Sequence, residues 1–256
     1  MTKTDKHEAG SVCWVDLMTT DAEKARNFYK GLFDWTFFVG GPETGHYSMG
    51  KLGDDNVAGL GQIQDGMKMP SAWTVYFASD DLDATIEKIK ANGGSVMMGP
   101  MDVMTEGRMG VFTDSTGVVF GVWQPMNHKG AGRVDEPGAM TWREVMTKDA
   151  AKAREFYGKV FGLEAKKLEG GSMDYWTLHK GPNTVCGVMQ MTDKHAHMPP
   201  HWNNYFAVAN ADAAAKKVTE LGGQVYAQPF DSPYGRIAIV ADPTGAAFSI
   251  VQTPAT

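Results

Sequence analysis

The chain has 256 residues, of which 43% are hydrophobic and 21% are charged, and its formal net charge is −6 at pH 7. This composition is typical of a globular protein with a sizeable core and excludes intrinsic disorder. The negative charge argues against nucleic acid or an anionic membrane as a partner, and no apolar run is long enough for a signal peptide or a membrane span, so we expect a cytoplasmic protein.

The first predicted element is a strand over residues 11–19. Val12, Trp14 and Asp16 would point to one face of this strand, and Cys13, Val15 and Leu17 to the other. Asp21 stands at the N-cap position of a helix, and its apolar residues recur at helical spacing from Ala22 to Phe33. Three short strands are then expected around residues 35–40, 45–52 and 55–63.

The same order of elements follows a second time. A strand is predicted over residues 72–79, and a helix over 82–92 ends where Gly93 can adopt the left-handed conformation. Three further strands are expected near residues 95–103, 108–113 and 118–124. The first half of the chain therefore contains two β-α-β-β-β units.

The second half of the chain repeats the first at an offset of about 128 positions, which is the signature of a tandem duplication. The matched residues include tryptophans, the helix motif Phe-Tyr and a closing turn. We predict a first module over residues 9–125, a linker over 126–137 and a second module over 138–254. The matches include Trp14 with Trp142, Asp21 with Asp149, Phe28-Tyr29 with Phe156-Tyr157, and Thr116-Gly117 with Thr244-Gly245.

The opening motif Trp14-Val15-Asp16-Leu17, with Asp21 and Phe28-Tyr29 after it, and the turn Asp242-Pro243-Thr244-Gly245 carry a family resemblance. The chain resembles the glyoxalase/bleomycin-resistance/dioxygenase, or vicinal oxygen chelate, superfamily. The resemblance implies an α+β fold of tandem duplicated glyoxalase-like modules, in which four β-α-β-β-β units form curved mixed sheets around concave pockets. Many members hold one divalent metal in such a pocket.

The resemblance also implies where the metal ligands should stand, in the first, fifth and closing strands of a module. None of the matching residues in this chain is His, Cys, Asp or Glu, and an indole has no lone pair to offer a metal. We therefore predict no metal site and no cofactor; a displaced divalent metal site is the alternative. The matching residues are Trp14, Thr74 and Gly121 in the first module and Trp142, Asn203 and Ser249 in the second.

Asp16 and Glu144 are the candidate catalytic residues. They lie two positions beyond the two tryptophans, so strand alternation places them on the same face, toward the predicted pockets. One interpretation is structural, in which each carboxylate pairs with an arginine, caps a strand or binds water. The other is functional, in which each is a general acid/base or orients a substrate.

The remaining candidate residues are expected to line the ligand pockets; for the four aromatic ones among them, burial in the core is the alternative. Aromatic walls with a few polar groups are typical of sites for small organic ligands. For the two arginines, a cross-strand pair with Asp102 or Asp231 is favoured, and a guanidinium that binds a substrate carboxylate or enolate is the alternative. The candidates are Trp14, Thr74, Tyr76, Arg108, Trp142, Asn203, Tyr205 and Arg236.

The cysteines and the clustered methionines are expected to be buried. Cys13 and Cys186 occupy unmatched positions, which favours two buried, reduced thiols over a disulfide or a thiolate metal site. The methionines crowded between Met97 and Met109 are expected to fill gaps in the core.

Three classes of function remain. The favoured hypothesis is a protein that has lost the family's metal ligands and binds a small organic ligand, aromatic or dicarbonyl, in an aromatic-lined pocket. One alternative is an enzyme, a glyoxalase-like lyase or a hydroxylase/dioxygenase, that uses Asp16 and Glu144 or a displaced metal. The other is a scaffold whose cavities are filled. The expected partner is a small molecule, and the chain is a monomer or a homodimer.

Overall fold

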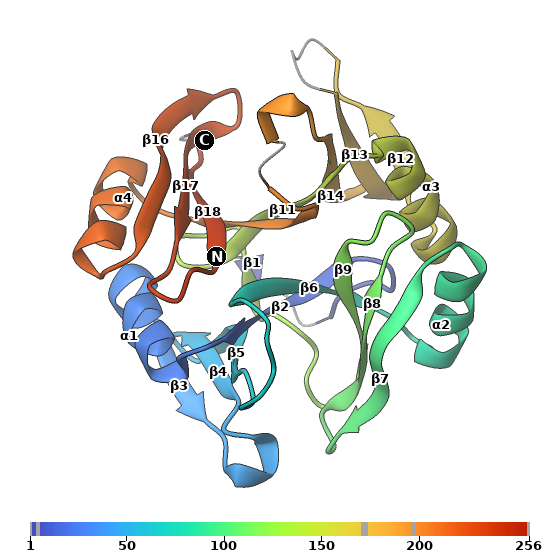
Figure 1. Cartoon of the computed structure of the whole chain (residues 1–256), viewed down its shortest axis with the longest axis horizontal. Coiled ribbons are helices and arrows are strands. Elements are labelled where there is room, and N and C mark those ends of the chain that lie inside the picture. Colours follow the sequence, from blue (N-terminus) through green and yellow to red (C-terminus); the bar gives the residue numbers. More distant parts are fainter. Residues whose placement is uncertain (1, 4–5, 170–173, 196–197, 255–256) are drawn as a thin grey trace.

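The computed structural model describes residues 2–3, 6–169, 174–195 and 198–254, and its architecture consists of two eight-stranded sheets, each built from one half of the chain (Figure 1). The first sheet has the strand order β3-β4-β5-β2-β6-β9-β8-β7. Its strands are β2 (Val12–Thr19), β3 (Thr36–Val39), β4 (Ser48–Leu52), β5 (Asp55–Gln62), β6 (Ala72–Ala78), β7 (Ser95–Val103), β8 (Gly107–Thr113) and β9 (Val119–Pro125).

The second sheet repeats this order as β12-β13-β14-β11-β15-β18-β17-β16. A short pair, β1 (Thr2–Lys3) with β10 (Arg133–Val134), joins the N-terminal segment to the linker. The strands of the second sheet are β11 (Met140–Thr147), β12 (Glu164–Lys167), β13 (Tyr175–Lys180), β14 (Asn183–Gln190), β15 (His201–Ala207), β16 (Gln224–Ser232), β17 (Gly235–Ala241) and β18 (Ala247–Gln252).

Both sheets are mixed, as the duplicated β-α-β-β-β units require. In the first sheet β2 and β6 pair antiparallel at the centre, while β2 pairs parallel with β5 and β6 pairs parallel with β9. Each unit therefore closes on its own first strand, and the two units meet along β2 and β6. Figure 1 shows each sheet bent so that its two halves face each other. The predicted fold, two tandem glyoxalase-like α+β modules, is confirmed.

Four helices follow the first strands of the four units. The two N-caps that the sequence predicts, Asp21 and its counterpart Asp149, are both observed. The side chain of Asp21 accepts a hydrogen bond from the backbone N–H of Lys24, and Asp149 does the same for Lys152. Gly93, with φ of +85°, follows the second helix. The helices are α1 (Ala22–Phe33), α2 (Leu82–Ala91), α3 (Ala150–Phe161) and α4 (Ala211–Glu220).

The two modules pack through their helix-covered faces. Helix α1 lies beside α4, and α2 lies beside α3 (Figure 1). Two equivalent hydrogen bonds cross the interface: Tyr29 donates to Asp242 over 3.1 Å, and Tyr157 donates to Asp114 over 2.9 Å. One hydrophobic core, which includes Phe28 and Phe248, draws buried residues from both modules. The concave faces of the sheets therefore lie away from this shared core.

Strand alternation divides the aromatic residues between the two faces. Trp73 and Trp202 belong to the shared core, and Trp73 donates its indole N–H to Tyr29. Trp14 and Tyr76 belong to a separate cluster on the opposite face of the first sheet. Cys13 and Cys186 are free and buried, in agreement with the sequence-based expectation.

The prediction that the clustered methionines fill the core is wrong for four of the five. Met97, Met98, Met101 and Met104 are between 42% and 64% exposed, because the first three lie on the edge strand β7 and Met104 lies in the turn that follows it. Only Met109, on β8, packs against the buried cluster around Trp14. Within the part of the chain that the structure describes, no helix is long and apolar enough to span a membrane.

Candidate functional site on the concave faces

The centre of the first concave face is built by the alternation of residues along β2. Trp14 and Asp16 point to this face, whereas Val15 between them points into the shared core. Asp16 lies opposite Thr74 on β6 and Gly59 on β5. This arrangement brings the sequence-predicted Trp14, Asp16, Thr74 and Tyr76 together.

Asp16 is a buried carboxyl with uneven hydrogen bonding. Its Oδ2 accepts hydrogen bonds from the hydroxyls of Tyr47, at 3.3 Å, and Tyr76, at 3.2 Å. Its Oδ1 is buried and has no hydrogen-bond partner among the described residues. Burial raises the pKa of Asp16 to about 7, although the two tyrosine hydroxyls lower it. The carboxyl can therefore hold or release a proton near neutral pH.

Tyr47 links Trp14 to Asp16 and was not among the sequence-predicted site residues. The Trp14 indole N–H donates to the Tyr47 hydroxyl over 3.2 Å. The ring lies so close to Gly59 that a Cβ there would stand 1.6 Å from the hydroxyl oxygen. Tyr47 and its counterpart Tyr175 match at the repeat offset of about 128 residues, so the repeat itself contained the signal.

The residues at the superfamily's usual ligand positions do not fit a metal. Trp14 presents an N–H donor that Tyr47 already accepts. The Tyr76 ring covers Gly121, where a Cβ would lie 2.2 Å from a ring carbon, so a longer side chain at this position would need Tyr76 to move. In the described portion of the chain, no group of three or more His, Cys, Asp or Glu residues could hold a metal ion.

The segment predicted as a linker folds over one end of the first concave face. The His128 ring stands edge-on to Trp14 with 4.5 Å between ring centroids, and the Trp123 indole donates to the His128 carbonyl. Burial lowers the pKa of His128 to about 4, so the ring is neutral at pH 7. Its Nε2 is buried and unpartnered within the described residues. Sequence reasoning missed His128, because the linker has no counterpart to compare with.

The second concave face repeats the network with its polar groups satisfied. The Trp142 indole donates to Tyr175 over 2.8 Å, and Tyr205 donates to the buried carboxylate of Glu144 over 2.7 Å. Asn203 and Ser249 bond to each other. A cluster of buried methionines, Met146, Met189 and Met191, packs beside Tyr175. The second face is therefore lined in part by flexible methionine side chains, and it has fewer polar atoms without a hydrogen-bond partner than the first.

Arg108 and Arg236 lie on the helix-covered side, which corrects the prediction that they line the pockets. Arg108 shares its strand face with buried Phe112, and it bonds to Asp102, at 3.0 Å, and to Asp83 at the start of α2, at 2.9 Å. Arg236 binds Asp231 and Asp212 in the same way. The favoured cross-strand pairs with Asp102 and Asp231 are confirmed. Arg108 therefore links the first turn of α2 to the β7–β8 hairpin, and Arg236 links the first turn of α4 to the β16–β17 hairpin.

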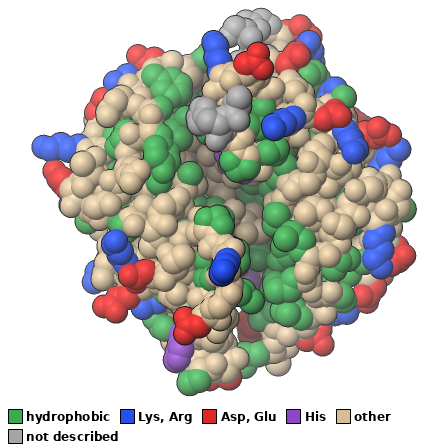
Figure 2. Space-filling view, in the orientation of Figure 1, with side chains coloured by type: hydrophobic (Ala, Val, Ile, Leu, Met, Phe, Trp, Pro, Cys, Tyr) green, Lys and Arg blue, Asp and Glu red, His purple; other side chains and the backbone are tan. Residues whose placement is uncertain are grey.

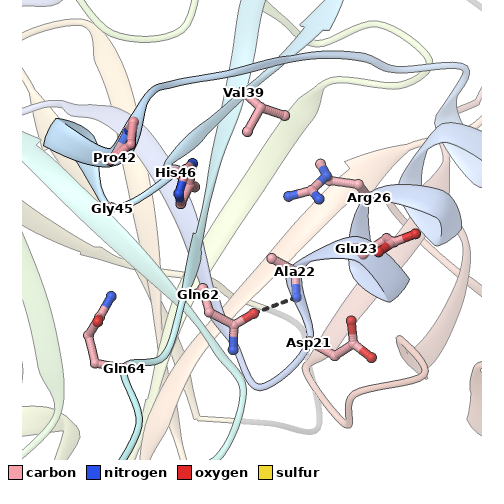
Figure 3. A pocket seen from close by; sticks show the side chains of 10 residues that line it. All are labelled: Asp21, Ala22, Glu23, Arg26, Val39, Pro42, Gly45, His46, Gln62 and Gln64. Atoms are coloured by element: carbon pink, nitrogen blue, oxygen red, sulfur yellow. Dashed lines mark hydrogen bonds between the residues drawn. The ribbon is translucent and has the colours of Figure 1, made fainter.

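A separate open cavity of about 730 Å³ lies at the start of α1 (Figure 3). The Arg26 side chain extends into it toward the loop that carries His46, and its guanidinium donates to Ser48 over 3.2 Å. In the second module the equivalent Arg154 stacks over Trp176, 3.9 Å from the ring centroid. The side chains of Asp21 and Glu23 also line the cavity, so its charge is mixed.

The surface view shows a recess near the centre of the drawn face, with hydrophobic side chains at its edges (Figure 2). Two apolar surface groups are the methionines of β7 and the exposed aromatic residues Tyr226, Phe230 and Tyr234 of the β16–β17 hairpin.

Comparisons with known proteins agree with this architecture. The family model described as Glyoxalase/Bleomycin resistance protein/Dioxygenase superfamily matches residues 11–122 and 139–250. The chain is 40% identical to "Putative glyoxylase CFP32" of Mycobacterium tuberculosis over 260 residues, which cover 98% of each chain. It is 38% identical to "Anthracycline biosynthesis protein DnrV" of Streptomyces peucetius over 259 residues, which cover 95% of this chain and 93% of the relative.

Solved structures show the same fold at low sequence identity. The Mn(II)-bound glyoxalase from Novosphingobium aromaticivorans superimposes with a TM-score of 0.67 at 14% identity, covering 95% of this chain and 82% of the other. The 2,3-dioxygenase LapB from Pseudomonas sp. KL28 superimposes with a TM-score of 0.66 at 13% identity, covering 96% and 93%.

Proposed function

Because the chain belongs to the glyoxalase/bleomycin resistance protein/dioxygenase superfamily, we propose that the concave face of its first module binds a small organic ligand without a metal. One observation carries the proposal. Asp16 is buried among aromatic residues beside the position of the family's first ligand, and its Oδ1 has no hydrogen-bond partner within the described residues.

The unmatched polar atoms indicate which ligand chemistry suits this face. A buried polar atom without a partner costs about 1–3 kcal/mol, which a ligand oxygen would recover. Protonated Asp16 donates to a carbonyl, and ionised Asp16 accepts from a hydroxyl; its pKa of about 7 makes both forms accessible. Trp14 and Tyr76 supply aromatic surface. These groups suit a flat aromatic ligand with phenolic or quinone oxygens.

The first module suits such a ligand better than the second. Glu144 is bonded to Tyr205, and Asn203 to Ser249, so a ligand oxygen would have to displace bonds already made. Besides the Asp16 Oδ1, the first face has a second unpartnered polar atom, the Nε2 of His128, again within the described residues. The similarity to a relative named as an anthracycline biosynthesis protein makes an anthracycline aglycone a suitable probe, since its chromophore carries both kinds of oxygen.

The test is a fluorescence titration of the full chain with an anthracycline aglycone in the presence of a chelator. We expect saturable binding that Asp16→Asn weakens by about tenfold, as for loss of one hydrogen bond to a charged group. The matched variant Glu144→Gln is expected to leave the affinity unchanged. An equal loss of affinity in both variants, or no loss in Asp16→Asn, would contradict the proposal that the ligand binds to the first face.

A second candidate function is enzymatic, and the raised pKa of Asp16 favours it. In this case Asp16 removes a proton from the carbon next to a substrate carbonyl and returns it to an adjacent atom, which is a metal-independent isomerisation. The hemithioacetal of a 2-oxoaldehyde is the probe. A rate that rises with pH through about 7 and disappears in Asp16→Asn would support turnover; a rate equal to that without protein would exclude it for this probe.

A further inference from the structure

A second cavity, of about 400 Å³, lies where the N-terminal segment, the linker and the second module meet. Its walls come from the segment before β2 and the first residue of β2, from β10 and the residue after it, and from strands β11, β13 and β14. No part of it belongs to either concave face. Eight residues matter for its chemistry: Lys6, Glu8, Val12, Val134, Asp135, Arg143, Lys180 and Asn183.

Arg143 is the unusual wall residue. It is largely enclosed, and its Nε is buried without a hydrogen-bond partner. Its side chain forms neither an ion pair nor a hydrogen bond with any residue that the structure describes. Asp135 attracts it from farther away and is itself bonded to Thr141. Burial lowers the pKa of Arg143, which shows how little compensation the surroundings give its charge.

The arginine is specific to the second module. Its counterpart in the first module is Val15, which is fully buried in the shared core. An apolar residue therefore suits this strand position, and an enclosed guanidinium without a partner is costly compared with it. This cost is offset when an anion occupies the cavity beside the guanidinium.

We propose that this cavity binds a small organic carboxylate, held by Arg143 and assisted by Lys180. A planar guanidinium matches the two oxygens of a carboxylate. Lys180 brings a second cation whose ammonium is fixed by a hydrogen bond to the Phe161 carbonyl. The cavity volume lies within the range of small-molecule sites.

The other wall residues define the ligand more closely. Val12 and Val134 offer an apolar surface to a short aliphatic tail, and Asn183 offers an amide. The carboxylates of Glu8 and Asp135 also line the cavity and oppose a multiply charged anion. A monocarboxylate with a branched short chain therefore fits better than inorganic phosphate.

The experiment follows the Arg143 Nε–H signal by NMR while the full chain is titrated with isovalerate, with phosphate, and with chloride at equal ionic strength. We expect a saturable shift with isovalerate alone, and a rise in the thermal midpoint with the same concentration dependence. Arg143→Met should abolish the rise in midpoint, and the matched control Arg26→Met, which changes a half-buried arginine in another cavity, should retain it.

Val134→Phe keeps the guanidinium and fills the cavity from the linker side, so it tests the site even if Arg143→Met does not fold. We expect isovalerate to bind this variant at least about tenfold more weakly, as for a ligand excluded from its pocket. A response equal to that of chloride, a saturable response to phosphate but not isovalerate, or unchanged binding in Val134→Phe would each overturn the proposal.

Discussion

The wild-type protein should lose stability as the pH rises toward 7, and replacing Asp16 with Asn should remove this loss. The pKa of Asp16 is about 7 in the folded protein, compared with its ordinary value of 3.8. Below pH 3.8 the carboxyl is protonated in both states and pH has no effect through it. Between pH 4 and 7 the unfolded chain releases the proton and the folded chain keeps it. The free energy of unfolding therefore falls by about 1.4 kcal/mol for each pH unit in this window.

The loss is complete above pH 7, where it amounts to about 4 kcal/mol. The Asn side chain does not titrate, and its amide oxygen can still accept hydrogen bonds from the hydroxyls of Tyr47 and Tyr76. Urea unfolding of both proteins at pH 5, 6, 7 and 8 measures the effect as the difference between their free energies of unfolding. That difference should grow by about 2 kcal/mol from pH 5 to pH 7 and then level off by pH 8.

Two variants control for other causes. Tyr76→Phe removes a hydrogen bond that lowers the pKa of Asp16, so stability should continue to fall beyond pH 7. Asp83→Asn changes an exposed carboxylate whose pKa Arg108 lowers, so any trend should have the opposite sign. A difference between wild type and Asp16→Asn that stays constant from pH 5 to pH 8 would refute the assignment of Asp16 as the titrating group.

Three further outcomes are expected. Tyr157→Phe should cost about 1.5–3 kcal/mol in urea unfolding, because it leaves the buried Asp114 carboxylate without a bond across the module interface; no change would mean that this bond contributes nothing. Gly59→Ala should weaken binding of the anthracycline aglycone, because a Cβ there collides with the Tyr47 hydroxyl; aglycone affinity equal to wild type would show that Tyr47 does not shape the site. Peptide mass spectrometry after mild peroxide treatment should find Met97 and Met104 oxidised before the buried Met146 and Met189, and the reverse order would contradict the burial described for these residues.

The fold could be predicted because its signals are local or repeated. Period-two alternation along β2 separates Trp14 and Asp16 from Val15, and this assignment needs only the strand. Asp21 and Asp149 cap their helices through bonds to residues three positions later. The duplication then supplies an independent second copy of each signal.

The predictions that were wrong or missing concern contacts between segments that are distant in the sequence. The face of β8 that carries Arg108 is fixed by Asp83 on α2, a partner that alternation alone cannot identify. The methionines of β7 have the composition of a core strand but lie at the sheet edge. His128 reaches Trp14 only because the linker folds back, and nothing in its local sequence indicates that path.

The most direct test of metal-independent binding at Asp16 compares one titration under two conditions. Chelator-treated protein and the same protein reconstituted with Mn²⁺ are each titrated with the anthracycline aglycone. We predict the same dissociation constant in both, because Trp14, Thr74 and Gly121 provide no metal ligand. Binding that requires Mn²⁺ would contradict the account.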